Sequence, residues 1–256
     1  MPQFAAIADW LSSPLGRRVH ALECKHAGAA LAQVFGWQLL QIGHWGDDGA
    51  LLSEARTQHK TILARAWPEP LAGISRVQSR TDALAIAADS VDAVFLPHTL
   101  EHEPDPYALL REVERILMGD GCLVVLGFRA ASFWGMRHLF ARNGFPPGTE
   151  RLLGERRVRD WLKLLGFEVI DAQRYLFTAP WGKAAPSAQR FAETIGGNLW
   201  PFLAGAYLLK ARKRVYTMTP VRWRWRKPAQ VVGGLIEPAR RGSTPASFAP
   251  PGNRRP

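Results

Sequence analysis

Apolar residues recur at helical spacing in four parts of the chain. Residues 5–34 show this spacing, and Pro14 divides them into a short helix and a longer one. The best-marked helix starts at Asp105, which can cap its first turn, with Pro106 in the first helical position. Another helix is predicted over 156–165. We therefore expect helices distributed along the whole chain.

Between these helices, short runs are apolar at nearly every position, which is typical of strands buried on both faces. Gly119 is expected to end the helix that begins at Pro106, and the pair Asp120-Gly121 to turn the chain into the next strand. The predicted strands cover 37–42, 59–67, 74–80, 91–97, 122–128, 167–177 and 202–214.

Alternating strands and helices predict an α/β fold of the Rossmann-like type, with a mostly parallel sheet and helices on both faces. In such sheets the ligand lies beyond the carboxyl ends of the strands, where the strand order reverses. The turns after residues 42, 80 and 96 are therefore the places to look for a site.

Composition narrows the class of protein. The chain has 256 residues, 47% of them hydrophobic, and no run of 18 apolar residues that would predict a transmembrane helix. The N-terminus lacks the pattern of a signal peptide, so a cytoplasmic protein is expected. Cys24 and Cys122 lie far apart and are expected to be free thiols in a reducing compartment.

The net charge of +11 belongs to the C-terminal end. Residues 210–256 contain 12 Lys and Arg but one acidic residue, whereas the rest of the chain is neutral. Residues 214–256 are predicted to be a disordered basic tail. The tail could contact nucleic acid or an anionic surface, or it could simply be a solvated segment.

The stretch LLQIGHWGDDG (39–49) is a strand that leads into a glycine-containing turn. Such a turn can bring backbone close to a cofactor. Trp45 and Asp47, however, are larger than the residues that usually line a cofactor loop. The stretch alone leaves two interpretations open, a modified cofactor loop and an ordinary strand-to-helix turn.

Residues 81–128 distinguish between them. They contain DSVDAV at the start of a strand, then HTLEH, a helix that begins Asp-Pro, the helical LREVERIL and a Gly-Asp-Gly turn before the next strand. This order closely resembles the class I S-adenosylmethionine-dependent methyltransferases of the type 11 kind. The resemblance extends more weakly over 36–213, which implies a seven-stranded methyltransferase-like domain preceded by helices (1–35) that pack on the sheet.

The resemblance also implies S-adenosyl-L-methionine as cofactor, held across the tips of the first, second and fourth strands. Gly43 matches the first glycine of the family's loop, and Gly46 is its neighbour. The next family glycines fall on Trp45 and Asp47, and the acid that precedes the loop falls on Gln41.

The remaining cofactor contacts are placed in the same way. The carboxylate that usually grips the ribose has no counterpart at 63–65, and the next acid is Glu69. Asp82, followed by Ala83 and Leu84, is expected at the adenine, although the alignment could slip onto Arg80. The turn beneath the methionine part matches His98, Thr99 and Leu100.

Catalytic residues are less defined, because methyl transfer depends mostly on positioning and desolvation. His98 and His102 are weak candidates for a general base, and His102 could instead pack at the start of a helix. With Glu101 they lack the spacing of a metal site, so no metal is expected.

Residues 129–150 stand where such enzymes carry a cover over the substrate. Their side chains Phe133, Trp134, Arg137 and Arg142 could line a pocket or pack a surface helix.

The sequence therefore predicts a methyltransferase whose acceptor is unidentified, with a small molecule favoured. Two alternatives remain open: a non-catalytic descendant that binds the cofactor or its product, and a nucleic-acid-associated protein that uses the basic tail.

Overall fold

The computed structural model describes residues 2–64, 74–142, 144–180 and 204–215. The chain divides into two units, Met1–Tyr216 and Thr217–Pro256. The second unit and nearly all of the predicted basic tail lie outside the described residues, as does Glu69. Among the described residues, no helix has the length and apolar character needed to cross a membrane.

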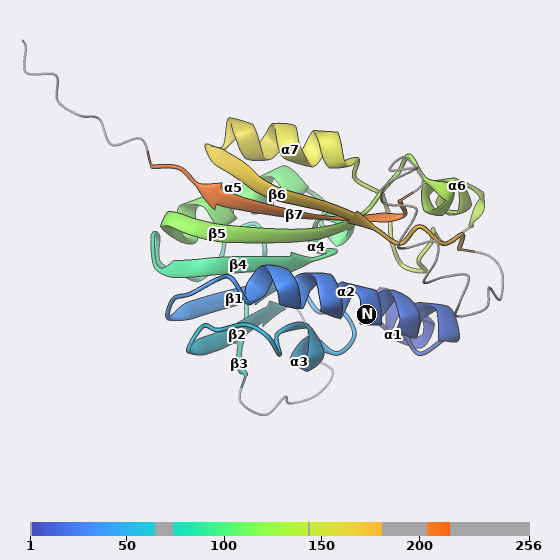
Figure 1. Cartoon of the computed structure of the whole chain (residues 1–256), viewed down its shortest axis with the longest axis horizontal. Helices are drawn as coiled ribbons and strands as arrows, with labels where there is room; N and C mark the ends of the chain where they lie inside the picture. The colour runs from blue at the N-terminus through green and yellow to red at the C-terminus, as the bar shows by residue number, and fades with distance from the viewer. Residues whose placement is uncertain (1, 65–73, 143, 181–203, 216–256) are drawn as a thin grey trace, which may run out of the picture. The chain divides into compact units, whose positions relative to one another are not determined.

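Seven strands form one sheet in the order β3-β2-β1-β4-β5-β7-β6 (Figure 1). The first five strands are parallel, and β7 runs antiparallel to both β5 and β6. The predicted mostly parallel α/β sheet is thus confirmed. The strand bounds are β1 Gln38–Ile42, β2 His59–Ala64, β3 Ser75–Gln78, β4 Val91–Pro97, β5 Leu117–Phe128, β6 Phe167–Tyr175 and β7 Ala206–Lys213.

Helices cover both faces of the sheet. Their bounds are α1 Pro2–Leu11, α2 Pro14–Leu31, α3 Asp48–Leu51, α4 Thr99–His102, α5 Pro106–Ile116, α6 Phe133–Phe140 and α7 Glu155–Leu164. Successive strand residues point to opposite faces, so Leu39 packs in the core that contains α1 and α2, whereas Leu40 packs in the core that contains α5 and α7. These two cores make the fold a three-layer α/β/α arrangement (Figure 1).

One predicted boundary was wrong. Gly119 does not end the helix: α5 ends at Ile116, and β5 begins directly at Leu117. Leu117 is fully buried and pairs with Val91, and the register shifts before the next pair, which joins Ala93 to Cys122. Tertiary pairing with β4 thus draws the glycine turn into the strand as an irregularity.

The order of the strands also sets the position of the ligand site. The chain moves from β1 outward through β2 and β3, then crosses to the other side of β1 to form β4 and β5. The reversal lies between β1 and β4, and a crevice is expected beyond their carboxyl ends.

Candidate functional site

A cavity lies at the carboxyl ends of β1, β2 and β4, where the strand order reverses. Gly43 and His44 follow β1, Leu63 and Ala64 end β2, and Pro97 ends β4. Ile7 of α1 also lines the cavity, together with Thr81, Thr99, His102 and Glu103. The enclosed volume is about 100 Å³. The cavity thus lies at the switch point, where open α/β sheets usually bind their ligands.

Gly43 brings bare backbone to this cavity. Its φ is +90°, a conformation that side-chain-bearing residues rarely adopt, and an added Cβ would lie 2.7 Å from Oγ1 of Thr99. That hydroxyl donates a hydrogen bond to the carbonyl of Ile42, which joins the end of β1 to the start of α4. The glycine is therefore required by both conformation and space.

Gly46, the second predicted loop glycine, has a different neighbourhood. Its φ is +66°, and a Cβ would lie 2.7 Å from the ring of His20 on α2. Gly46 lines a separate groove beside α2, so the structure does not bring it together with Gly43 in the cavity.

Gln41 stands where the family has an acid, and Asp48 supplies a carboxylate beside it. Both side chains are buried, and Nε2 of Gln41 donates to Oδ1 of Asp48 at 2.6 Å and to the carbonyl of Gly43 at 3.0 Å. Asp48 also accepts from the backbone N–H of Trp45 and contacts Nδ1 of His44 at 2.5 Å. Sequence reasoning missed Asp48 and His44, although the second Asp of the GDDG stretch was a visible signal.

Trp45 does not line the cavity. Its ring is fully buried between the sheet and the N-terminal helices, with its centroid 4.3 Å from that of His98 and 6.0 Å from that of Phe128. Its Nε1 donates to Glu23 of α2 at 2.6 Å. Trp45 therefore anchors the loop to α2, and its bulk does not obstruct the site.

Asp47, at the other glycine position of the family, caps a helix. Its side chain accepts from the backbone N–H of Ala50 at 3.0 Å, in the first turn of α3.

His98 lies in a sealed network of charged groups. Its Nε2 is 2.8 Å from Glu23, its Nδ1 is 3.1 Å from Glu101, and its side chain is fully buried. Burial alone would lower the pKa of His98, but the two carboxylates raise it to about 9. Glu101 also accepts from the backbone N–H of Phe128 at the end of β5. The ring of His98 thus ties α2, α4 and β5 together, out of reach of the cavity lining.

His102 does line the cavity. Its Nε2 is buried without a hydrogen-bond partner among the described residues. Burial and the positive charge of His98 lower the pKa of His102 to about 4, so its ring is neutral at physiological pH. Of the two predicted histidines, His102 is therefore the one that a ligand can reach.

The predicted adenine segment lies at the edge of the site. Asp82 is exposed and contacts Arg80 at 2.5 Å, and Ala83 is also exposed, whereas Leu84 is buried beside α5. Asp82 lines a different surface pocket, next to α5. Its neighbour Thr81 lines the cavity and donates to Glu103 at 2.7 Å. Thr81 and Glu103 are polar lining residues that sequence reasoning did not single out.

Leu100 is buried in the core on the α5 side of the sheet, directly after Thr99.

The segment after β5 packs as a helix. Trp134 of α6 is fully buried and stacks on Phe128, with centroids 5.6 Å apart. The guanidinium of Arg137 lies 3.8 Å from the ring centroid of Phe145, and Arg142 is exposed. Among the described residues, Cys24 and Cys122 are free thiols and no group of side chains could hold a metal ion.

Comparison with known proteins agrees with this geometry. Residues 51–125 match the model of a methyltransferase domain. The chain is also 32% identical over 243 residues to the uncharacterized protein YafS of Escherichia coli, covering 91% of this chain and 94% of that protein. The chain belongs to the same family as YafS, and this family carries a methyltransferase domain.

Solved structures share the fold of this methyltransferase. A possible histamine N-methyltransferase from Thermotoga maritima, described as SAM-dependent, superposes with a TM-score of 0.59 at 17% identity, covering 80% of this chain and 93% of that chain. An S-adenosylmethionine-dependent methyltransferase from Mesorhizobium loti gives 0.52 at 16% identity, covering 73% and 96%. The fold and the methyltransferase domain are thus those expected from residues 81–128.

Proposed function

We propose that this methyltransferase binds S-adenosyl-L-methionine in the cavity at the tips of β1, β2 and β4 and transfers its methyl group to a small molecule. The observation that carries the proposal is Gly43, whose positive φ and missing side chain place backbone at the switch point of the sheet. Bare backbone there is what a cofactor needs for close approach.

The lining residues fit the parts of this cofactor. Glu103 and Thr81 offer a carboxylate and a hydroxyl for ribose or adenine groups, close to the predicted contacts Asp82, Ala83 and Leu84. Leu63 and Ala64 offer apolar contact, and Gly43 with His44 offers backbone. When bound, the cofactor supplies an electrophilic methyl group, while the protein orients both reactants and excludes water.

The small volume of the cavity also indicates that the surrounding residues move when the cofactor binds. Ligand pockets usually measure about 300–1,000 Å³, which is larger than the enclosed 100 Å³ seen here. Because Ile7 of α1 lines the cavity, we expect α1 to shift when the cofactor enters. Hydrogen exchange should show altered protection in α1 when S-adenosylhomocysteine is added, and unchanged exchange there would contradict this part.

Calorimetry with the full chain tests the proposal directly. S-adenosylmethionine and S-adenosylhomocysteine should both bind, and Glu103→Gln should weaken binding about tenfold or more, since a hydrogen bond to a charged group contributes about 1.5–3 kcal/mol. Glu168→Gln, which changes an exposed residue on β6, is the control. No heat with millimolar ligand would overturn the proposal.

We also propose a cytoplasmic location and a small-molecule acceptor. The free thiols Cys24 and Cys122 support a reducing compartment, which is the cytoplasm. Methyl transfer, measured as S-adenosylhomocysteine formation, separates an enzyme from a descendant that only binds the cofactor. The small-molecule acceptor is supported by a groove beside the cavity.

A further inference from the structure

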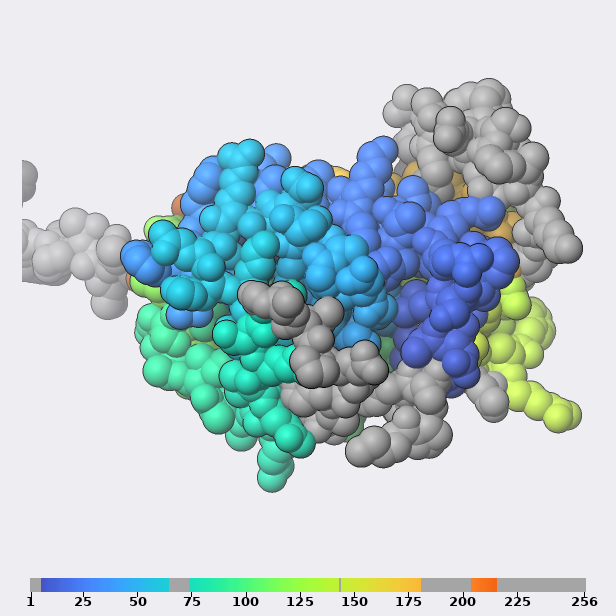
Figure 2. Space-filling model, turned by 90° about the horizontal axis from the view of Figure 1, so that it is seen from below, coloured from blue at the N-terminus to red at the C-terminus, as the bar shows by residue number. Residues whose placement is uncertain are grey.

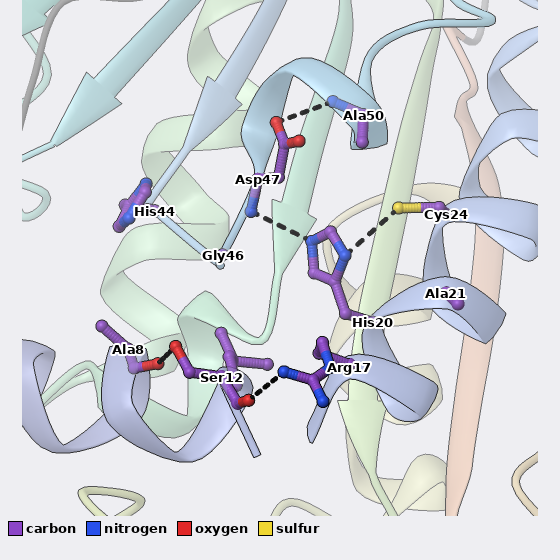
Figure 3. A pocket seen from close by; sticks show the side chains of 11 residues that line it. Ala8, Ser12, Arg17, His20, Ala21, Cys24, His44, Gly46, Asp47 and Ala50 are labelled. Carbon is purple, nitrogen blue, oxygen red and sulfur yellow. Dashed lines mark hydrogen bonds between the residues drawn. The ribbon is translucent and has the colours of Figure 1, made fainter. Parts of the chain in front are cut away.

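A second hollow lies beside the cofactor cavity, between α1, α2 and the loop that joins β1 to α3. It is an open groove of about 680 Å³, a size within the range of small-molecule sites. In Figure 3, Arg17 and His20 come from α2 and Gly46 and Asp47 from the loop. The space-filling view shows the N-terminal helices in dark blue beside the lighter blue of the segment that follows β1 (Figure 2).

His44 lines both the cavity and this groove. If the cofactor occupies the cavity and the acceptor occupies the groove, the side chain of His44 lies next to both reactants. Gly46 and Asp47 line the groove without lining the cavity, and Thr99 and His102 do the reverse.

The His44 ring is oriented for proton transfer. Its Nδ1 contacts Asp48 at 2.5 Å, and Asp48 is in turn fixed by Gln41 and by the backbone N–H of Trp45. Nε2, on the other side of the ring, has no hydrogen-bond partner among the described residues, and the side chain is 22% exposed. A histidine held at one nitrogen by a carboxylate and open at the other is the usual arrangement of a general base.

The other titratable side chains of the groove are less suited to this role. Nε2 of His20 accepts from the backbone N–H of Asp47 at 3.1 Å, and its Nδ1 lies 3.5 Å from Sγ of Cys24. Burial raises the pKa of the Cys24 thiol to about 11, so this thiol stays protonated. Asp47 caps α3.

We propose that the groove holds the methyl acceptor and that His44, oriented by Asp48, accepts the proton that the acceptor loses. This inference rests on the proposed function, because it requires the cofactor in the neighbouring cavity. The acceptor's oxygen forms a bond to the methyl carbon, the carbon–sulfur bond breaks with its electron pair left on sulfur, and the hydroxyl proton passes to Nε2 of His44. The proton then leaves to solvent through the open groove.

The groove also indicates the class of acceptor. Ala8, Leu11 and Ala21 give it an apolar side, and the exposed Arg17 offers guanidinium N–H groups at its edge. A general base is needed for a hydroxyl, whereas a thiolate already carries its reactive electron pair. The acceptor is therefore a small organic acid that bears a hydroxyl on an apolar body.

The test uses two matched probes, 4-hydroxybenzoate and 4-mercaptobenzoate, with the full chain and S-adenosylmethionine. The wild type should methylate both. His44→Asn, which keeps a donor beside Asp48 but removes the base, should slow methylation of the hydroxyl by about 10²–10⁴-fold. The same variant should change methylation of the thiol, which is ionised at neutral pH, by less than about threefold.

Binding is measured separately, so that failure of the cofactor site is distinguished from failure of this inference. S-adenosylhomocysteine should bind wild type and His44→Asn within about threefold of each other by calorimetry, because the proposed contact of His44 with the cofactor uses its backbone, which the variant keeps. In its complex, 4-hydroxybenzoate should shift the imidazole NMR signals of His44, and Arg17→Gln should weaken the probe's affinity about tenfold. His59→Asn, at the opposite end of β2, is the control histidine.

An equal loss for both probes in His44→Asn would overturn the role of His44 as base. If S-adenosylhomocysteine binds but 4-hydroxybenzoate is neither bound nor methylated by the wild type, the groove is not the acceptor site for this class.

Discussion

Two histidine–carboxylate clusters lie near the end of β1. They differ in how many nitrogens of the histidine ring contact a carboxylate and in how deeply the ring is buried. His98 sits between Glu23 and Glu101 with both ring nitrogens engaged and no exposed surface. His44 is held by Asp48 alone and keeps one nitrogen open beside two hollows. A second carboxylate and complete burial leave His98 a structural role, whereas the open nitrogen of His44 is what our proposal of a general base rests on. The variants below test this difference from the largest effect to the smallest.

Removal of His98 should have the largest effect on stability. His98→Ala leaves Glu23 and Glu101 buried without their cation, and breaking a buried pair costs about 3–5 kcal/mol. Urea unfolding should show this loss, while His59→Ala, which changes an exposed residue, should cost less than about 0.5 kcal/mol. A loss below 1 kcal/mol for His98→Ala would show that the network is not structural.

The pH dependence of stability should come next. Because the folded pKa of His98 is raised to about 9, its contribution is complete below the unfolded pKa of about 6.5 and is lost as pH rises through 9. The loss is on the order of 3 kcal/mol over that window. Unfolding curves between pH 6.5 and 9.5 should show it in the wild type, and a His98→Gln variant should lack that slope.

Asp48→Ala should have an intermediate effect. It leaves Nε2 of Gln41 and the backbone N–H of Trp45 short of an acceptor, at a cost of about 1–3 kcal/mol. Denaturant unfolding measures the cost, with Asp160→Ala, which changes an exposed residue of α7, as the control. A neutral Asp48→Ala would mean that the loop is held by other contacts.

His44→Asn should affect stability least. The ring is partly exposed, and Asp48 keeps two other donors, so we expect a change below about 1 kcal/mol. Thermal unfolding of this variant beside His98→Asn checks the contrast directly. Equal losses for the two variants would remove the distinction between a structural and a reactive histidine.

Local sequence patterns located most elements because the signals are short-range. The cap Asp105 and Pro106 define the start of α5, which begins at Pro106 as predicted. The apolar run that ends at Pro97 matches β4 as predicted. The short helices α3 and α4 gave no such signal, since each has four residues and depends on its surroundings.

The site was harder to predict than the fold, because its contacts join residues far apart in sequence. Glu23 and His98 are separated by 75 positions, and no periodicity links them. The resemblance placed Trp45 at a glycine position of the family's cofactor loop, but it could not show in which direction the Trp45 side chain points. Whether a large side chain at a glycine position blocks a cofactor depends on which way it points, and α2 decides that.

The sequence by itself determined the α/β class, because apolar period, helix caps and turn residues act over a few positions, and segment 81–128 carried the resemblance to methyltransferases. Only the tertiary structure decided what replaces the family's loop residues. Trp45 turns inward to Glu23, and Asp48 takes a place beside Gln41. Those choices depend on packing and on pairing of buried polar groups, which form only when α2, β1 and α4 meet.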